Sequence, residues 1–400
     1  MKITTFALSA VFAAAALAAG AAQAQAQDKV KIGFITDMSS LYADVEGKNG
    51  ALAIQMAIDD FGGKVNGMPI ELLTADHQNK ADIAASKARE WIDTQGLTML
   101  FGGTSSGTGL AMAKVAHEKK RVFIVNGAGS SALTNEQCTP YTVHYAYDTV
   151  ALAKGTGSAV IGRGDKSWYF LTADYAFGQA LEGDATKVVK EKGGTVLGSV
   201  KHPLNTSDFS SFLLQAQNSK AQVLALANAG GDTINSIKAA KEFGITKNMK
   251  MVGLLVFVTD VHSLGLKNTE GLLLTTSWDW NLDDKTRAFG KRFFEKTKRM
   301  PTDIQAADYS ATMTYLKAVQ ASKTVDADKV MATLKSTPID DFYAKGNIRA
   351  DGRFVHDMYL VQVKSPAESK QPWDYYKVIQ KLKGEEVFTT KAESRCALWK

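Results

Sequence analysis

The sequence is poor in the residues on which metal centres and many active sites depend. Among 400 residues it has only 2 cysteines and 6 histidines. No His-x-x-x-His pair, no Cys-x-x-Cys pair and no group of carboxylates at ligand spacing occurs, so no metal site is predicted. The Gly-Thr-Gly at 155–157 lacks the rest of a dinucleotide-binding fingerprint. We therefore expect neither a metal ion nor another cofactor.

Concentrated charge and long apolar runs are scarce as well. The 47 basic and 41 acidic residues give a net charge of +6. The basic residues form no arginine-rich blocks, which argues against a nucleic-acid partner. One long apolar run is present, at residues 6–22, and no second run follows that could span a membrane. The mature protein is therefore expected to be soluble.

The N-terminal segment predicts export. Lys2 precedes the apolar run, and the Ala-Gln-Ala at 24–26 fits the small-residue pattern of a signal-peptide cleavage site. The run is too short and too rich in alanine for a membrane anchor. Residues 1–26 are therefore predicted to be a signal peptide cleaved near Ala26. About 374 residues remain (400 minus 26), more than one hydrophobic core usually supports, so we expect two domains.

The two cysteines, Cys138 and Cys396, lie far apart in the sequence. In an exported protein they favour a single disulfide, which would tie the C-terminal tail to the first half of the chain. Two buried free thiols are the alternative, because the sequence does not give the distance between the two residues.

Predicted strands alternate with predicted helices along the mature chain. This order predicts right-handed βαβ units, parallel sheets and an α/β fold. Four such units are followed by four more, so we expect two Rossmann-like lobes. Parallel sheets bind ligands at the carboxyl ends of their strands, which places the ligand cleft between the lobes. The predicted strands are 29–37, 69–76, 97–101, 121–125, 167–174, 195–200, 222–227 and 251–257.

A turn rich in glycine and serine follows the strand 97–101. Its sequence at 103–107, Gly-Thr-Ser-Ser-Gly, fits the G-x-S-x-G pattern of hydrolases, in which Ser105 would be the nucleophile. Its N–H groups and hydroxyls could instead hold a ligand carboxylate, or only cap the helix. A hydrolase needs a later base and acid; His356, beside Asp357, could be a late triad histidine, but no single pair of histidine and carboxylate stands out. No oxyanion-hole glycine run accompanies it. We favour the carboxylate site and keep an exported serine esterase as a remote alternative.

Five segments of the mature chain resemble one known family. They are 61–67 (Phe-Gly-Gly-Lys-Val-Asn-Gly), 75–80 (Ala-Asp-His-Gln-Asn-Lys), 171–178 (Leu-Thr-Ala-Asp-Tyr-Ala-Phe-Gly), 205–210 (Asn-Thr-Ser-Asp-Phe-Ser) and 355–370. With them the chain resembles the type I periplasmic solute-binding proteins of the branched-chain amino-acid class, which deliver ligands to ABC transporters. The resemblance covers essentially the whole mature chain and is specific for family and fold, though not for the ligand.

The resemblance implies an architecture and partners. It implies two lobes joined by three crossovers that close on the ligand by a hinge motion, in a periplasmic monomer that docks on an ABC permease of the inner membrane. A sensor subunit that docks on a receptor instead would share the fold. The crossovers map near 145–149, 277–280 and 351–354, which gives a first lobe of residues 27–146 plus 278–352 and a second of 147–277 plus 353–400.

The resemblance also implies where the ligand lies. Family members hold the ligand carboxylate on the turn at 104–106 and the loop at 127–129. Amino-acid binders usually have a threonine where this chain has Gly129, and an acidic residue against the ligand ammonium where this chain has Leu-Leu-Val-Phe at 254–257. An ammonium without a partner in an apolar site is costly. We therefore expect an aromatic acid of the phenylpropenoate or benzoate type.

A branched-chain or other hydrophobic amino acid stays open as the alternative ligand, since Asp174 or Asp232 could replace the missing acid. The predicted ligand contacts share a position at a strand end or a lobe junction. They are Tyr42, Thr104, Ser105, Ser106, Gly127, Ala128, Gly129, Ser130, Tyr147, Asp174, Tyr175, Phe177, Asn228, Asp232, Phe257, Trp278 and Trp280.

Overall fold

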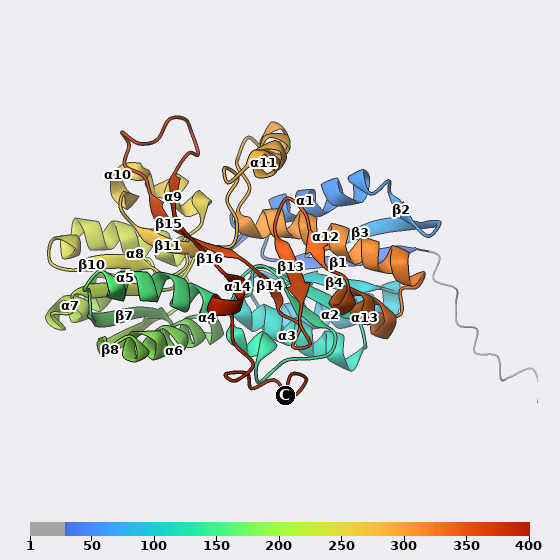
Figure 1. The fold of residues 1–400 in the computed structure, drawn as a ribbon, viewed down its shortest axis with the longest axis horizontal. Coiled ribbons are helices and arrows are strands. Elements are labelled where there is room, and N and C mark those ends of the chain that lie inside the picture. The colour runs from blue at the N-terminus through green and yellow to red at the C-terminus, as the bar shows by residue number, and fades with distance from the viewer. Residues whose placement is uncertain (1–28) are drawn as a thin grey trace, which may run out of the picture.

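The computed structural model describes residues 29–400 and has two α/β lobes side by side (Figure 1). The predicted signal peptide, 1–26, lies outside the described residues. Within 29–400 no helix is both long and apolar enough to cross a membrane. The two-lobed α/β fold predicted from the sequence is confirmed.

The first lobe contains a six-stranded sheet in the order β2-β3-β1-β4-β5-β6. Its strands pair in parallel except β2 with β3. Helix α12 packs along α1 on one face (Figure 1), so a late segment completes this lobe. The strands are β1 (Val30–Thr36), β2 (Lys64–Val65), β3 (Met68–Asp76), β4 (Met99–Gly102), β5 (Val122–Val125) and β6 (Thr142–His144). The helices are α1 (Gly47–Asp60), α2 (Ala81–Gln95), α3 (Ser106–Glu118), η1 (Ser131–Thr134), α11 (Asp284–Thr297), α12 (Asp303–Ser322) and α13 (Ala327–Ser336).

The second lobe contains a four-stranded parallel sheet in the order β10-β9-β7-β8. Its strands are β7 (Ser167–Ala173), β8 (Thr195–His202), β9 (Val223–Ala227) and β10 (Lys250–Gly253). The helices are α4 (Thr149–Leu152), η2 (Ala153–Gly157), α5 (Ser158–Gly162), α6 (Ala176–Glu191), α7 (Ser210–Asn218), α8 (Gly231–Glu242), η3 (Ile245–Lys247), α9 (Val258–Leu264) and α10 (Leu266–Thr269). The strand predicted at 251–257 was wrong in its second half, because the chain leaves the sheet after Gly253.

Two small antiparallel sheets and a last helix complete the chain. One sheet, β12-β13-β14, pairs segments that follow α13, and the other, β11-β15-β16, extends along the second lobe. The chain passes between the lobes after β6, after β11 and between β14 and β15 (Figure 1). The elements are β11 (Leu273–Thr276), β12 (Ile339–Asp340), β13 (Lys345–Ile348), β14 (Phe354–His356), β15 (Met358–Val363), β16 (Tyr376–Leu382) and α14 (Gly384–Val387).

A buried arginine joins two of these crossovers. The guanidinium of Arg353 donates to the carbonyl oxygens of Tyr145 and Tyr147, the latter at 3.0 Å, and lies 4.4 Å from the ring centre of Phe388. Asp148 is 3.9 Å away. A buried cation needs such partners. Arg353 therefore fixes the first crossover against the chain that leads to the third.

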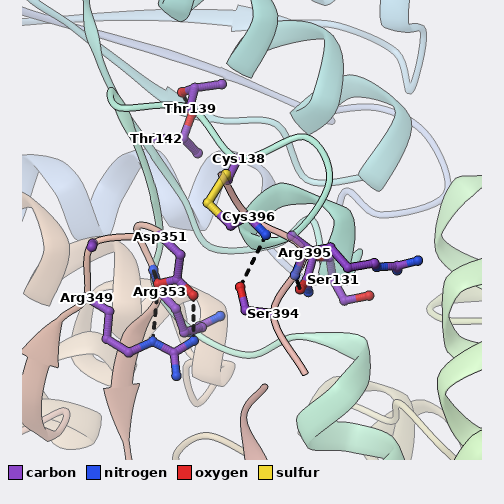
Figure 2. Close-up of a disulfide and its surroundings, with 12 residues drawn as sticks. Ser131, Cys138, Thr139, Thr142, Arg349, Asp351, Arg353, Ser394, Arg395 and Cys396 are labelled. Carbon is purple, nitrogen blue, oxygen red and sulfur yellow. Dashed lines mark hydrogen bonds and ion pairs between the residues drawn. A yellow bond between two sulfur atoms is a disulfide. The ribbon is translucent and has the colours of Figure 1, made fainter. Parts of the chain in front are cut away.

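The predicted disulfide is confirmed. Cys138 and Cys396 are bonded, with their Cα atoms 5.7 Å apart and 258 positions between them in sequence (Figure 2). The tail that carries Cys396 also touches the second lobe, because Glu393 accepts from Lys154 at 3.0 Å and from Lys187 at 3.3 Å. The tail therefore contacts both lobes near the first crossover.

Candidate functional site

A cavity lies between the two lobes, at the carboxyl ends of their parallel strands. The space between atoms there is about 260 Å³, which counts the gaps between side chains and some open solvent, so the cavity itself is narrow. Thirteen residues line it, and none of them has a charged side chain. They are Tyr42, Val45, Thr104, Ser106, Gly127, Gly129, Tyr147, Tyr175, Phe177, Ala229, Leu255, Phe257 and Ile304.

The turn between β4 and α3 brings hydroxyl groups to this cavity. The chain reverses sharply there, with φ of +102° at Gly102 and +71° at Gly103. A Cβ at Gly102 would lie 2.4 Å from the carbonyl oxygen of Ile35, so only glycine allows so tight an approach. Thr104 and Ser106, just after this turn, reach the cavity wall.

Ser105 and Ser106 have different roles although they are neighbours. The Ser105 hydroxyl caps helix α3, where it accepts from the backbone N–H of Thr108, and Ser105 does not line the cavity. The Ser106 hydroxyl accepts from the N–H of Ser130 at 3.0 Å. A hydroxyl has one donor hydrogen, so that of Ser106 stays available for a ligand. His356, the candidate base for a hydrolase, instead lies 2.7 Å from the carbonyl oxygen of Ala146.

Five aromatic rings contribute to the remaining wall. The centres of the Tyr175 and Phe177 rings are 6.1 Å apart, and those of Tyr147 and Phe257 are 6.4 Å apart. A Cβ at Gly129 would lie 2.9 Å from Phe177 and 3.0 Å from Tyr147. Glycine at this position therefore makes room for two rings, where a threonine would displace them.

The lobes touch each other over the cavity. The hydroxyls of Tyr42, from the first lobe, and Tyr175, from the second, are 2.6 Å apart. Burial raises the pKa of both phenols, so both stay neutral hydrogen-bonding groups. A Cβ at Gly230, where φ is +59°, would lie 3.0 Å from the carbonyl oxygen of Leu41. The backbones therefore approach as closely as a glycine permits, which is the arrangement of a closed cleft.

Several residues predicted as ligand contacts lie away from this cavity. Trp278 packs against Phe289 and Phe342, with ring centres 6.1 Å away in each case. The indole N–H of Trp280 donates to the carbonyl oxygen of Trp373 at 2.9 Å. Both tryptophans are buried core residues of the second crossover.

The two predicted acids are also occupied elsewhere. Asp174 is exposed and lies 3.6 Å from the Lys201 ammonium. Asp232 accepts from the backbone N–H groups of Asn205 and Thr206, at 3.3 and 3.0 Å, and burial raises its pKa to about 6. Neither side chain is among the lining residues, so neither supplies the missing partner for an ammonium.

Three other predicted contacts hold their loops in place. Asn228 is buried and bonds to Thr233 and Ser236 of helix α8. Ser130 caps η1, and the carbonyl oxygen of Ala128 bonds to His144 at 2.7 Å. These three residues shape the cavity loops and do not line the cavity.

Four lining residues were missed by the sequence analysis: Val45, Ala229, Leu255 and Ile304. Leu255 and Ala229 lie in segments recognised as strand-end loops, so choosing small and aliphatic residues there would have found them. Val45 precedes α1, and Ile304 lies in the first turn of α12. No local pattern marks these two residues, because the packing of α12 against α1, which lie far apart in the sequence, brings both to the cavity.

The described residues, 29–400, contain no group of three or more histidine, cysteine or acidic side chains placed to hold a metal ion. The cavity is an uncharged pocket lined by five aromatic side chains, with Thr104 and Ser106 at one end. Such a site orients a ligand through a few polar contacts and buries the rest of it.

Comparison with known proteins gives consistent results. Residues 29–370 match the family model described as periplasmic binding protein. The structure of a periplasmic binding protein from Burkholderia mallei is 67% identical, with a TM-score of 0.93, and covers 94% of this chain and 100% of that one. A branched-chain amino-acid ABC transporter periplasmic ligand-binding protein from Burkholderia xenovorans is 41% identical (TM-score 0.83; 93% and 100% covered). A solute-binding protein from R. palustris, solved with 4-hydroxybenzoate, is 23% identical (TM-score 0.81; 89% and 97% covered) and shares the fold.

Proposed function

The chain belongs to the periplasmic binding protein family and is a substrate-binding protein of an ABC transporter, and we propose that its ligand is a small aromatic acid of the benzoate or phenylpropenoate type. A member of this family binds its solute without transforming it. The family implies that the protein delivers this solute to an ABC permease.

The observation that carries the proposal is the lack of charge among the residues that line the cavity. An α-amino acid brings an ammonium as well as a carboxylate. A buried ammonium needs an acidic partner or several acceptors. The loop that follows β10 offers Leu255 and Phe257 instead. A ligand with one carboxylate and an otherwise apolar body fits this lining better.

The binding energy would come from both ends of such a ligand. Hydrogen bonds from Thr104, Ser106 and nearby N–H groups to a carboxylate contribute roughly 1.5–3 kcal/mol each. Burial of a ring against Tyr147, Tyr175 and Phe177 adds roughly 25 cal/mol per Å² of apolar surface. After the costs of ordering, dissociation constants in the low micromolar range or below are reasonable.

A hydrophobic amino acid is the second candidate, because the Burkholderia xenovorans relative is described as a branched-chain amino-acid transporter protein. Its ammonium would have to bond to backbone carbonyl and tyrosine hydroxyl oxygens. The R. palustris neighbour, at 23% identity, supports only that this fold accommodates a hydroxybenzoate.

A ligand panel separates the two candidates. We expect benzoate, 4-hydroxybenzoate or a phenylpropenoate at about 1 mM to raise the unfolding temperature by a few degrees, since saturation at about 100 times Kd stabilises by about 2.7 kcal/mol. Leucine, isoleucine and valine are expected to have no effect. Stabilisation by the amino acids alone would refute the aromatic-acid proposal.

The neighbouring serines provide a matched pair of variants. Ser106→Ala removes a donor from the cavity and is expected to weaken binding about 10-fold or more, from the roughly 1.5–3 kcal/mol of a charge-assisted bond. Ser105→Ala removes a helix cap and is expected to cost about 1 kcal/mol of stability with little change in affinity. Calorimetric titration and urea unfolding of both variants measure the two effects, and equal losses of affinity would contradict the assignment.

A further inference from the structure

A buried carboxylic acid lies directly behind the hydroxyl of Thr104. Glu46, the residue that precedes helix α1, has none of its surface exposed. Its Oε2 accepts from the hydroxyl of Thr104 at 2.5 Å and also from that of Thr36. Thr104 lines the ligand cavity, so one hydroxyl connects the cavity to an acid that solvent does not reach.

The other oxygen of this carboxyl has no partner. Oε1 of Glu46 is buried without a hydrogen bond, and so is Oδ2 of Asp308 on helix α12. Both acids border Gly50, where an added Cβ would lie 2.5 Å from Oδ2 of Asp308 and 3.1 Å from Cγ of Glu46. Two ionised carboxylates this close repel each other strongly, so at least one of the pair holds a proton.

The charge of Glu46 decides what Thr104 can offer to a ligand. Its hydroxyl has one hydrogen and already accepts from the N–H of Asp37 at 3.2 Å. When Glu46 is ionised, that hydrogen points to Oε2 and Thr104 presents only lone pairs to the cavity. The hydroxyls of Thr36 and Thr104 also bond to each other. When Oε2 carries a proton, it can donate to Thr36 and Thr36 can donate to Thr104, so the Thr104 hydrogen becomes free for a ligand carboxylate.

We propose that Glu46 is a positioning residue that couples ligand binding to protonation, so that a carboxylate at Thr104 and Ser106 is bound together with uptake of a proton by the Glu46–Asp308 pair. The inference rests on the carboxylate of the proposed function and not on its aromatic ring. Glu46 would then influence which ligand charge is accepted although it does not line the cavity.

The surroundings of Glu46 favour proton uptake. The titratable groups that face it are Asp37 at the end of β1, Asp308 on α12 and the neutral phenol of Tyr147. Burial, with a smaller contribution from Asp37, raises the pKa of Glu46 to about 7, and burial raises that of Asp308 further above its usual range. A ligand carboxylate adds one more negative charge and raises the pKa of Glu46 again. Affinity should therefore be highest below pH 7 and fall as the pH rises through it.

The test is calorimetric titration of the full mature protein with the carboxylate that the panel identifies. Titrations at pH 8 in buffers of different ionisation enthalpy give the number of protons taken up. We expect more than about half a proton per ligand at pH 8, little uptake at pH 5.5, and an affinity that falls up to tenfold per pH unit above 7. The neutral amide of the same acid should bind without either effect.

Glu46→Gln gives the matched variant, since its neutral amide imitates the protonated acid. It should bind the ligand within about 3-fold of the wild-type affinity at pH 6, keep that affinity at pH 8.5, and take up no proton. Glu182→Gln is the control, because Glu182 also accepts from a threonine, Thr172, at 2.6 Å, but in the second lobe and away from the cavity.

Each result decides a separate question. Binding of the acid by wild-type protein with no proton uptake and a flat pH profile would overturn the coupling while leaving the proposed function intact. Failure of every aromatic acid to bind would refute the proposed function instead. The wild-type titrations need no variant, so they decide the question even if Glu46→Gln does not fold.

Discussion

Leu255→Asp is expected to weaken the binding of aromatic acids strongly. Leu255 lines the cavity on the second lobe, in the loop where the related amino-acid binders are expected to have an acid. A carboxylate there would face the ligand carboxylate. At ~5 Å, with an effective dielectric constant of ~20, the repulsion is ~3 kcal/mol, which weakens binding on the order of 100-fold. In the same variant we expect measurable binding of leucine or isoleucine, whose ammonium gains a partner.

Leu255→Asn separates charge from size in this experiment. It removes the same apolar surface without adding a charge, so it should lose roughly 10-fold in affinity for the acid and gain nothing for amino acids. Titration calorimetry with one acid and one amino acid measures all four combinations. If both variants lost affinity equally, and neither bound leucine, the loop after β10 would not be the determinant of ligand charge.

The sequence predicted the lobes and the hydroxyl end of the cavity because local patterns encode them. The strand that ends at Gly102 and the turn after it have a hydrophobic run, two glycines and a helix cap in sequence. The disulfide followed from having two cysteines in an exported chain. The apolar character of the loop with Leu255 and Phe257 was predicted because the four residues 254–257 are neighbours in the sequence.

Other parts of the site depend on packing between distant segments. Trp278 and Trp280 follow a strand end as a ligand contact would, but their rings turn into the core, where Phe289, Phe342 and the carbonyl of Trp373 receive them. Ile304 reaches the cavity only because α12 packs along α1. The direction in which a side chain at a lobe junction points depends on these contacts between distant segments, so it cannot be predicted from the local sequence.

The burial of Glu46 could not be predicted from the local sequence either. In sequence it is one acid in a polar loop before a helix, and nothing there indicates burial. Its role depends on Thr36, Thr104 and Asp308, which are brought to it by β1, β4 and α12. A candidate site read from the lining residues alone would also omit it, because it acts through Thr104.

Removing the disulfide is expected to have the largest effect on stability. The bond closes a loop of 258 positions, so it restricts the unfolded chain strongly. Loss of a native disulfide typically costs about 2–5 kcal/mol, and so long a loop places the expectation near the upper end. The double variant Cys138→Ser/Cys396→Ser should therefore unfold at a clearly lower urea concentration, and wild-type protein unfolded without reductant should show no reactive thiol.

Glu393→Gln distinguishes the covalent bond from the contacts of the tail. It keeps the disulfide but weakens the pairs with Lys154 and Lys187, which are partly exposed and worth about 1 kcal/mol or less. The variant loosens the tail from the second lobe, while the disulfide and contacts such as the bond from the Arg395 N–H to Asn135, at 3.2 Å, still hold it to the first lobe. An equal loss of stability in Glu393→Gln and in the double serine variant would mean that the tail's contacts, rather than its covalent attachment, stabilise the fold.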